Sequence, residues 1–177
     1  MSRELPYIGD SETLSYYHAD AGKEHYKLLI YVSQELKPKL TFDVGTCRGA
    51  SALALSNGSK KVVSYDIQDG LNLPNRTQLT TIEFIIGDVL TDDRLITSDL
   101  ILLDAWHHGV FEKRFVNYLV DNDYKGILLL DDIHLKDSGL PEWWKNLKHP
   151  RKYDITKYGH GSGTGMLVFN DTRIKLG

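Results

Sequence analysis

The fold is decided by a stretch that reads Phe42-Asp43-Val44-Gly45-Thr46-Cys47-Arg48-Gly49-Ala50-Ser51. Gly45, the first of its two glycines, lets the backbone turn tightly after a strand. A helix that starts near the second one directs free N–H groups toward a carboxylate or a phosphate. The spacing Gly-x-x-x-Gly fits neither the dinucleotide motif nor the P-loop. The stretch predicts a strand, a turn and a helix, and by itself it is equally typical of a plain tight turn.

Short apolar runs with β-branched residues recur along the chain and predict buried strands. Runs without polar alternation are typical of parallel strands that are covered on both faces. The last two runs are joined by a glycine-rich turn over residues 159–165, which is too short for a crossover helix, so they should pair antiparallel. The sequence therefore predicts a doubly wound, mostly parallel, Rossmann-like seven-stranded α/β sheet with a C-terminal antiparallel hairpin. The predicted strands are Leu40–Val44, Lys61–Asp66, Ile82–Asp88, Asp99–Asp104, Gly126–Asp132, Lys152–Tyr158 and Gly165–Asn170.

Two helical patterns have one apolar face each, and both should pack on the sheet. The faces consist of Leu28, Leu29, Val32 and Leu36 before the first strand, and of Phe111, Phe115, Tyr118 and Leu119 between the fourth and fifth strands.

The length of 177 residues predicts one domain over residues 1–177. The contents of 41% hydrophobic and 25% charged residues argue against disorder and coiled coil. A net charge of −3 argues against nucleic acid and anionic membrane as partners. The single cysteine, Cys47, excludes an intrachain disulfide and favours a reducing compartment. With no signal-peptide pattern and no spanning apolar stretch, we expect a cytoplasmic protein.

Acidic residues stand at the carboxyl ends of four predicted strands, the edge where ligands bind in open parallel sheets. A single aspartate there is often only a helix N-cap. Repetition on four strands favours a site, and a carboxylate after the second strand can accept both hydroxyls of a ribose. These residues are Asp43, Asp66, Asp104 and the pair Asp131-Asp132.

The stretch from Phe42 to Ser51 resembles the first motif of class I S-adenosylmethionine-dependent methyltransferases, in a form similar to the catechol O-methyltransferase branch. The resemblance spans roughly residues 40–132 and includes the final hairpin. It implies that residues 1–38 form an N-terminal helical cap segment, with Tyr16-Tyr17-His18 as a lid element. It also implies a cofactor site for S-adenosylmethionine, with the ribose at Asp66 and the adenine near Asp88. The implied cofactor-binding residues are Asp43, Gly45, Thr46, Gly49, Ser51, Asp66, Ile67, Asp88 and Asp104.

The segment after the fourth strand lacks the Asn/Asp-Pro-Pro pattern of enzymes that methylate base nitrogens. Instead, Asp104 with Asp131 and Asp132 is similar to the metal site of cation-dependent O-methyltransferases. Three adjacent carboxylates repel one another without a cation, and hard oxygen ligands suit Mg²⁺, with Ca²⁺ or Mn²⁺ as alternatives. The other interpretation is that Asp132 only caps the next segment and Asp131 alone faces the cleft.

His107 follows Asp104 by three residues, where bacterial sugar and antibiotic O-methyltransferases often have a histidine. An imidazole can take a hydroxyl proton near neutral pH, so His107 is the predicted base or substrate ligand, with Asp104 also in the catalytic set. His134 is expected to be exposed or outside the site, and His160 to be a solvated loop residue that could cover the site. The adjacent Trp143 and Trp144 should lie on a short helix, one packed and one more exposed, the latter near an acceptor or at a homodimer interface.

These features together predict an S-adenosylmethionine-dependent, Mg²⁺-assisted O-methyltransferase that acts on a hydroxyl of a small molecule or sugar. Vicinal hydroxyls would chelate the cation best, and His107 slightly favours a sugar. Two alternatives stay open. One is a metal-dependent hydrolase or hydroxylase-like relative on the same fold, and the other is a noncatalytic cofactor-binding or scaffold protein.

Overall fold

A computed structural model describes residues 20–70 and 80–171 of the chain. The predicted lid residues Tyr16, Tyr17 and His18 lie outside the described residues, as does the part of the predicted cap segment before Asp20. Within the described ranges, no helix is both long enough and apolar enough to cross a membrane.

The centre of the molecule is a seven-stranded sheet with the order β3-β2-β1-β4-β5-β7-β6. Strands β1 to β5 run parallel, whereas β7 pairs antiparallel with both β5 and β6. The predicted fold, including the C-terminal antiparallel pair, is confirmed. The strands are β1 (Thr41–Val44), β2 (Val62–Asp66), β3 (Ile82–Ile86), β4 (Leu100–Leu103), β5 (Ile127–Asp131), β6 (Lys152–Asp154) and β7 (Thr164–Val168).

The sixth predicted strand is longer than the observed one. Asp154 Oδ1 accepts hydrogen bonds from the backbone N–H of Thr156 at 3.0 Å and from its hydroxyl at 2.5 Å. Such a side-chain-to-backbone bond competes with the ladder and favours a turn. The chain therefore leaves the sheet after Asp154 and forms a 3-10 turn over Thr156–Tyr158.

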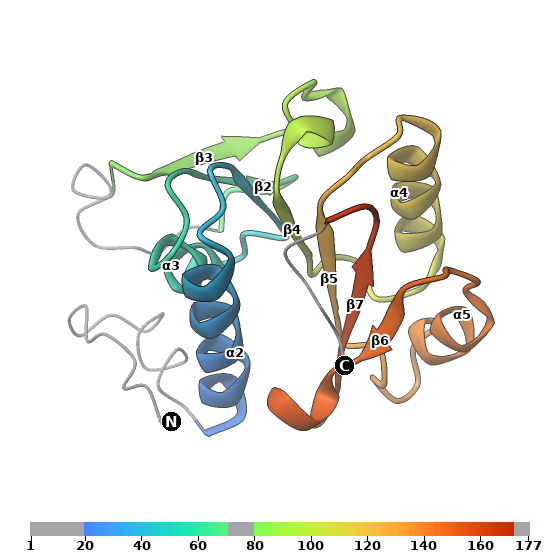
Figure 1. The fold of residues 1–177 in the computed structure, drawn as a ribbon. Coiled ribbons are helices and arrows are strands. Elements are labelled where there is room, and N and C mark those ends of the chain that lie inside the picture. The colour runs from blue at the N-terminus through green and yellow to red at the C-terminus, as the bar shows by residue number, and fades with distance from the viewer. Residues whose placement is uncertain (1–19, 71–79, 172–177) are drawn as a thin grey trace.

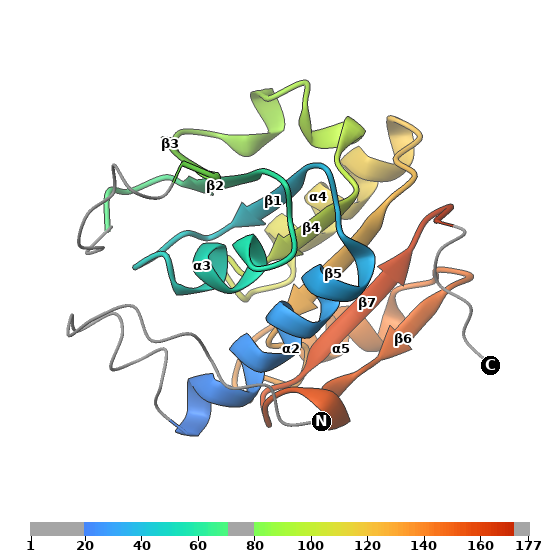
Figure 2. The same cartoon turned by 60° about the vertical axis from the view of Figure 1, so that its left-hand side comes forward.

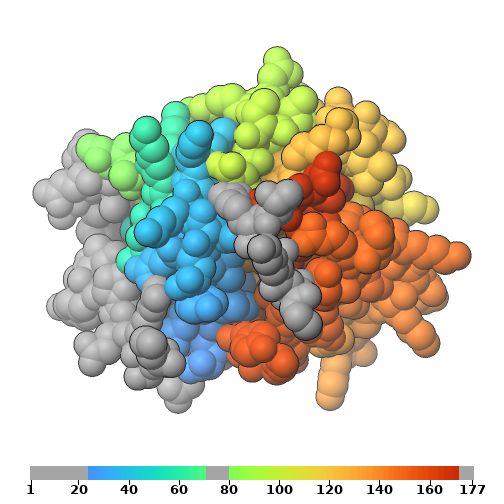
Figure 3. All heavy atoms as spheres, viewed as in Figure 1, coloured from blue at the N-terminus to red at the C-terminus, as the bar shows by residue number. Residues whose placement is uncertain are grey.

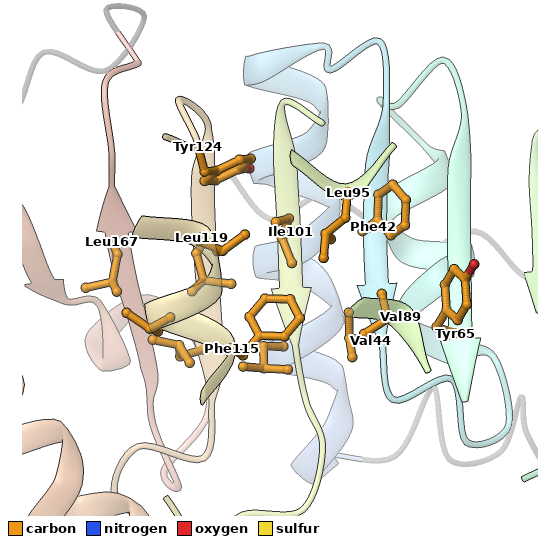
Figure 4. Close-up of a cluster of buried hydrophobic side chains, with 14 of the residues drawn as sticks. Phe42, Val44, Tyr65, Val89, Leu95, Ile101, Phe115, Leu119, Tyr124 and Leu167 are labelled. Atoms are coloured by element: carbon orange, nitrogen blue, oxygen red, sulfur yellow. The ribbon is translucent and has the colours of Figure 1, made fainter. Parts of the chain in front are cut away.

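Helices cover both faces of the sheet, as a doubly wound fold requires (Figure 1). The helices α2 (Asp20–Leu36) and α3 (Ala50–Ser56) lie on one face, and α4 (Val110–Asp121) and α5 (Leu140–Asn146) lie on the other (Figure 2). Side chains alternate along β4, so that Leu100 and Leu102 pack toward α2 and α3. Ile101 points to the opposite face, where it lies beside Phe115 of α4 (Figure 4).

Helix α2 brings the N-terminal part of the chain against the C-terminal hairpin. Two residues of its predicted apolar face, Leu28 and Leu29, are buried. A Cβ atom on Gly159 would lie only 3.1 Å from Leu28 Cδ2, and α2 runs next to the hairpin segment in the space-filling view (Figure 3). Side chains from α2 can therefore meet side chains from the hairpin and from the end of β5.

Candidate functional site

The turn after β1 has the backbone that its glycines predict. Gly45 and Gly49 have φ angles of 104° and 91°, and a Cβ at Gly45 would lie 1.8 Å from the carbonyl oxygen of Asp104. The amides of Gly45 and Thr46 both donate to the Tyr65 carbonyl, and that of Gly49 donates to the Thr46 carbonyl. The turn therefore holds itself against β2 and β4, and these three amides are not offered to a ligand.

Two predicted cofactor residues in this stretch, Thr46 and Ser51, have buried side chains. Thr46 is buried and its hydroxyl lies 2.6 Å from the hydroxyl of Ser64. Ser51, in the first turn of α3, is also buried, and its hydroxyl lowers the pKa of Asp43. Cys47 is exposed, with a φ of 45°. Thr46 and Ser51 also line a cavity of about 610 Å³, so their assignment to the cofactor stays a prediction.

Asp43 is a fully buried carboxyl group within β1. The Ser64 hydroxyl donates to its Oδ2 at 2.6 Å, whereas its Oδ1 has no hydrogen-bond partner among the described residues. Burial raises the pKa of Asp43 to about 6, against the smaller opposing effects of Ser64 and Ser51. Its charge therefore acts on the site through space rather than by direct exposure to a ligand.

A cavity of about 660 Å³ opens at the carboxyl ends of β1, β2, β3 and β4, within the range of about 300–1,000 Å³ that is usual for ligand pockets. Asp66 lies in its wall and accepts hydrogen bonds from the amides of Cys47 at 2.8 Å and Gln68 at 3.1 Å. A carboxylate has about four acceptor sites, so Asp66 can still accept two ribose hydroxyls. The predicted residues Ile67 and Asp88 line the same cavity, and both are exposed.

Beyond Asp104 the chain places a histidine between two carboxylates. His107 Nε2 lies 3.5 Å from Asp104 Oδ1, and its Nδ1 lies 3.5 Å from Asp132 Oδ2. Three residues here have left-handed backbone: the φ angles of Trp106, His107 and Asp132 are 65°, 54° and 60°. Left-handed backbone is uncommon in residues other than glycine and is concentrated at functional sites. Burial and the charges of Asp131, Asp132 and Asp43 raise the pKa of Asp104 well above its usual value.

The three acidic residues that the sequence predicts as one metal site are divided between two clusters. Asp104 and Asp132 group with His107, whereas Asp131 groups with His25 and His160. The reason is that side chains alternate in direction along β5 and that the backbone turns directly after this strand. Asp131 is the last residue of the strand and is buried beneath α2 and the hairpin, and Asp132 turns the other way with its left-handed backbone. Asp104 lies in the wall of the first cavity and also belongs to the cluster with His107 and Asp132.

A second cavity, of about 610 Å³, has both clusters in its wall. It shares residues with the first cavity, and the shared positions are Gly45, Cys47, Asp104 and His107. Two ligands bound in the two cavities would therefore meet at Asp104 and His107.

The remaining predicted residues have distinct places. His134 is 42% exposed and pairs with Asp154 at 2.7 Å, outside both clusters. His160, predicted as a solvated loop residue, is half-buried instead, because its Nε2 contacts Asp131 Oδ1 at 2.7 Å. On α5, Trp144 is buried and Trp143 is more exposed, as predicted.

Comparison with known proteins identifies the fold by its structural neighbours. No family model and no curated protein matches the sequence. Among solved structures, the O-methyltransferase TomG from Streptomyces achromogenes, in complex with S-adenosylmethionine, has a TM-score of 0.61 at 15% identity, over 93% of this chain and 92% of that one. The chain has the class I methyltransferase fold. The methyltransferase PaMTH1 from Podospora anserina, bound to S-adenosylhomocysteine, has a TM-score of 0.59 at 17% identity. The match covers 97% of this chain and 100% of that one.

The methyltransferase fold does not by itself fix the acceptor atom. The N-methyltransferase NodS from Bradyrhizobium japonicum is also similar, with a TM-score of 0.59 at 13% identity over 88% of this chain and 99% of that one. Oxygen and nitrogen acceptors both occur on this scaffold, so the acceptor has to be argued from the side chains at the site.

Sequence reasoning did not single out His25, which the structure places beside Asp131 and His160. It lies on α2, about a hundred residues away from Asp131 along the chain, and nothing near it in the sequence marks a ligand. Only the packing of α2 against the hairpin brings it to Asp131. Trp106 was also without an assigned role, and it is 57% exposed in the wall of the first cavity.

Proposed function

We propose that the chain is an S-adenosylmethionine-dependent O-methyltransferase whose acceptor is a small molecule with vicinal hydroxyls, either a sugar or a catechol-like ring. The observation that carries the proposal is the meeting of the two cavities at Asp104 and His107. One cavity is suited to a nucleoside because Asp66 keeps acceptor capacity at its wall. The other has the polar groups that an acceptor hydroxyl needs.

The charge of the site suits a cationic cofactor. Asp43, Asp66 and Asp104 stand at or near the first cavity, and an excess of carboxylates stabilises a positive ligand. When bound, S-adenosylmethionine supplies an activated methyl group on a positively charged sulfonium. Asp66 binds its ribose hydroxyls, and Asp43 stabilises its positive charge through space.

The cluster of Asp104, Asp132 and His107 suits the acceptor. The two carboxylates offer the hard oxygen ligands that Mg²⁺ prefers, and one ligand atom from each of the three residues lies within 4.8 Å of the others. A divalent cation held there would supply Lewis acidity to an acceptor hydroxyl. His107 takes the hydroxyl proton at Nε2, and Asp132 beside Nδ1 stabilises the imidazolium that results. Orientation of the two reactants contributes to the rate as well.

Calorimetry with S-adenosylmethionine and S-adenosylhomocysteine tests the cofactor assignment. Asp66→Ala should weaken both ligands by about 1.5–3 kcal/mol, the range for hydrogen bonds to a charged group. Asp93→Ala is the matched control, because Asp93 is exposed and lines neither cavity. Unchanged affinity in Asp66→Ala would remove the ribose assignment, and with it the main support for this function.

A further inference from the structure

A second set of metal-ligand side chains lies beside the proposed acceptor site. It combines His25 from α2, Asp131 from the end of β5 and His160 from the hairpin turn. His25 Nδ1 lies 3.4 Å from Asp131 Oδ1, and His160 Nε2 lies 2.7 Å from the same oxygen. The two imidazole rings meet edge to face, with centroids 4.7 Å apart. Three segments that are distant in sequence thus converge on one carboxylate oxygen.

His25 is the member of this cluster that needs an explanation. Its side chain is only 7% exposed, and neither ring nitrogen has a hydrogen-bond partner among the described residues. Buried polar groups in folded proteins nearly always have a partner, and each exception calls for a physical cause. His25 lies in the wall of the cavity of about 610 Å³, and a neutral imidazole carries one lone pair on a ring nitrogen. A neutral imidazole with a free lone pair is what a metal ion requires.

The other two ligands are held in position from behind. The Ser162 hydroxyl lies 2.8 Å from His160 Nδ1, which leaves Nε2 directed at Asp131. The Thr164 hydroxyl lies 3.5 Å from Asp131 Oδ1. Metal-binding histidines usually have such an outer partner on the second nitrogen, which fixes the ring orientation. The cluster therefore has both ligands and their supports.

The spacing fits one ion of ordinary size. Two ligands with bonds of about 2.1 Å to a tetrahedral zinc ion lie about 3.4 Å apart, and His25 Nδ1 and Asp131 Oδ1 are 3.4 Å apart. The shorter contact between His160 and Asp131 is a hydrogen bond, and an ion between the two groups would take the place of its proton. Only a small movement of His160, on the hairpin turn, is then needed.

We propose that His25, Asp131 and His160 bind a divalent first-row transition-metal ion such as Zn²⁺. Imidazole donors suit this class of metal, whereas Mg²⁺ prefers oxygen ligands. The site is thus distinct in chemistry from the oxygen-rich cluster of Asp104 and Asp132. The inference rests on these three residues alone and does not require that the chain transfers methyl groups.

Three protein ligands leave a coordination position open, as in catalytic rather than structural zinc sites. The cavity of about 610 Å³ reaches this position, and Arg48 and Ser51 stand in its wall. A ligand with a carboxylate or hydroxyl oxygen would fit the open position. The ion also adds positive charge where Asp104, Asp131 and Asp132 concentrate negative charge. This proposed site therefore gives the acceptor cavity a second point of attachment.

Titration with Co²⁺ tests the site, because four- and five-coordinate Co²⁺ absorbs visible light strongly. The full chain is stripped with EDTA, dialysed and titrated with Co²⁺ while the visible bands and the heat of binding are recorded. His25→Leu and His160→Ala should weaken Co²⁺ binding by about 100-fold or more, since the loss of outer-shell partners alone costs up to about 100-fold. The matched control His134→Ala, which lies outside both clusters, should change the affinity by less than about threefold.

Two results would overturn the proposal. One is the absence of visible bands at millimolar Co²⁺ in the wild-type protein, and the other is loss of the bands in His107→Ala with retention in His25→Leu. Circular dichroism reports whether each variant is folded. A measurement on the wild-type protein avoids the variants altogether: Zn²⁺ should shift the ring-nitrogen resonances of His25 and His160 in NMR spectra and leave those of His134 unchanged. Calorimetry with S-adenosylmethionine tests the methyltransferase proposal separately.

Discussion

The substitution Asp43→Asn removes the buried charge within β1 and keeps the shape of the side chain. The pKa of Asp43 rises from 3.8 to about 6 because burial disfavours the charged form. That difference corresponds to about 3 kcal/mol between the two protonation states. Because the pKa is raised in the folded state, the folded protein binds the Asp43 proton more tightly than the unfolded chain does. The stabilising contribution of protonated Asp43 is fully present below pH 3.8 and is lost as the pH rises through about 6. Above that pH the carboxylate of Asp43 is charged in both states, and its charge is less favourable in the buried site than in the solvated unfolded chain.

Urea unfolding followed by circular dichroism between pH 4 and pH 8 measures this effect. The free energy of unfolding of Asp43→Asn, relative to the wild type, should increase by about 2.4 kcal/mol from pH 4 to pH 8. The exposed Asp93→Asn should show no such trend. A difference between Asp43→Asn and wild type that stays constant with pH would refute the reasoning. The same variant should bind S-adenosylmethionine more weakly in calorimetry at pH 8, because the buried charge no longer stabilises the positive ligand.

Three further results are expected. Gly45→Ala should destabilise the protein by about 1–3 kcal/mol in urea unfolding, since its Cβ would lie 1.8 Å from the Asp104 carbonyl oxygen at a φ of 104°, whereas Gly87→Ala, with open space around it, should not. His107→Gln should lower turnover about 10²–10⁴-fold and leave cofactor affinity unchanged, and wild-type turnover at every pH would exclude His107 as the base. EDTA should abolish turnover and Mg²⁺ should restore it without loss of cofactor binding. Full activity in excess EDTA would contradict the cation-assisted mechanism.

The sheet could be predicted from the sequence because its signals are local. Runs such as Leu100–Leu103 are apolar without alternation, and only a strand covered on both faces accepts that composition. The glycines at positions 45 and 49 need left-handed backbone, and the turn that they predict is present. The end of β6 was less predictable, because it depends on a hydrogen bond from Thr156 to Asp154 that competes with the strand.

The site was less predictable, because its contacts are not local. The order of the parallel strands brings Asp66, Asp104 and Asp132 to one edge, and this could be predicted from their positions at strand ends. The grouping of Asp131 with His25 and His160, and of Asp132 with Asp104 and His107, could not be predicted, since it depends on the directions of two adjacent side chains after β5. The role of His25 depends on how α2 packs against the hairpin, and a lone histidine in a helix carries no sign of that.

Charge explains why these features occur together. Burial and the neighbouring charges of Asp131, Asp132 and Asp43 raise the pKa of Asp104. Burial also acts to raise the pKa of Asp131, but His25, His160 and a backbone hydrogen bond at Asp132 lower it overall. Without ligands, the folded chain therefore holds carboxylates that repel one another. A positive cofactor and a metal ion would each relieve part of this repulsion, and a ligand that binds only the folded state raises stability by linkage. The thermal midpoint should therefore rise with S-adenosylmethionine and with a divalent cation, and the rise should be smaller for either ligand in Asp43→Asn, where one of the repelling charges is gone.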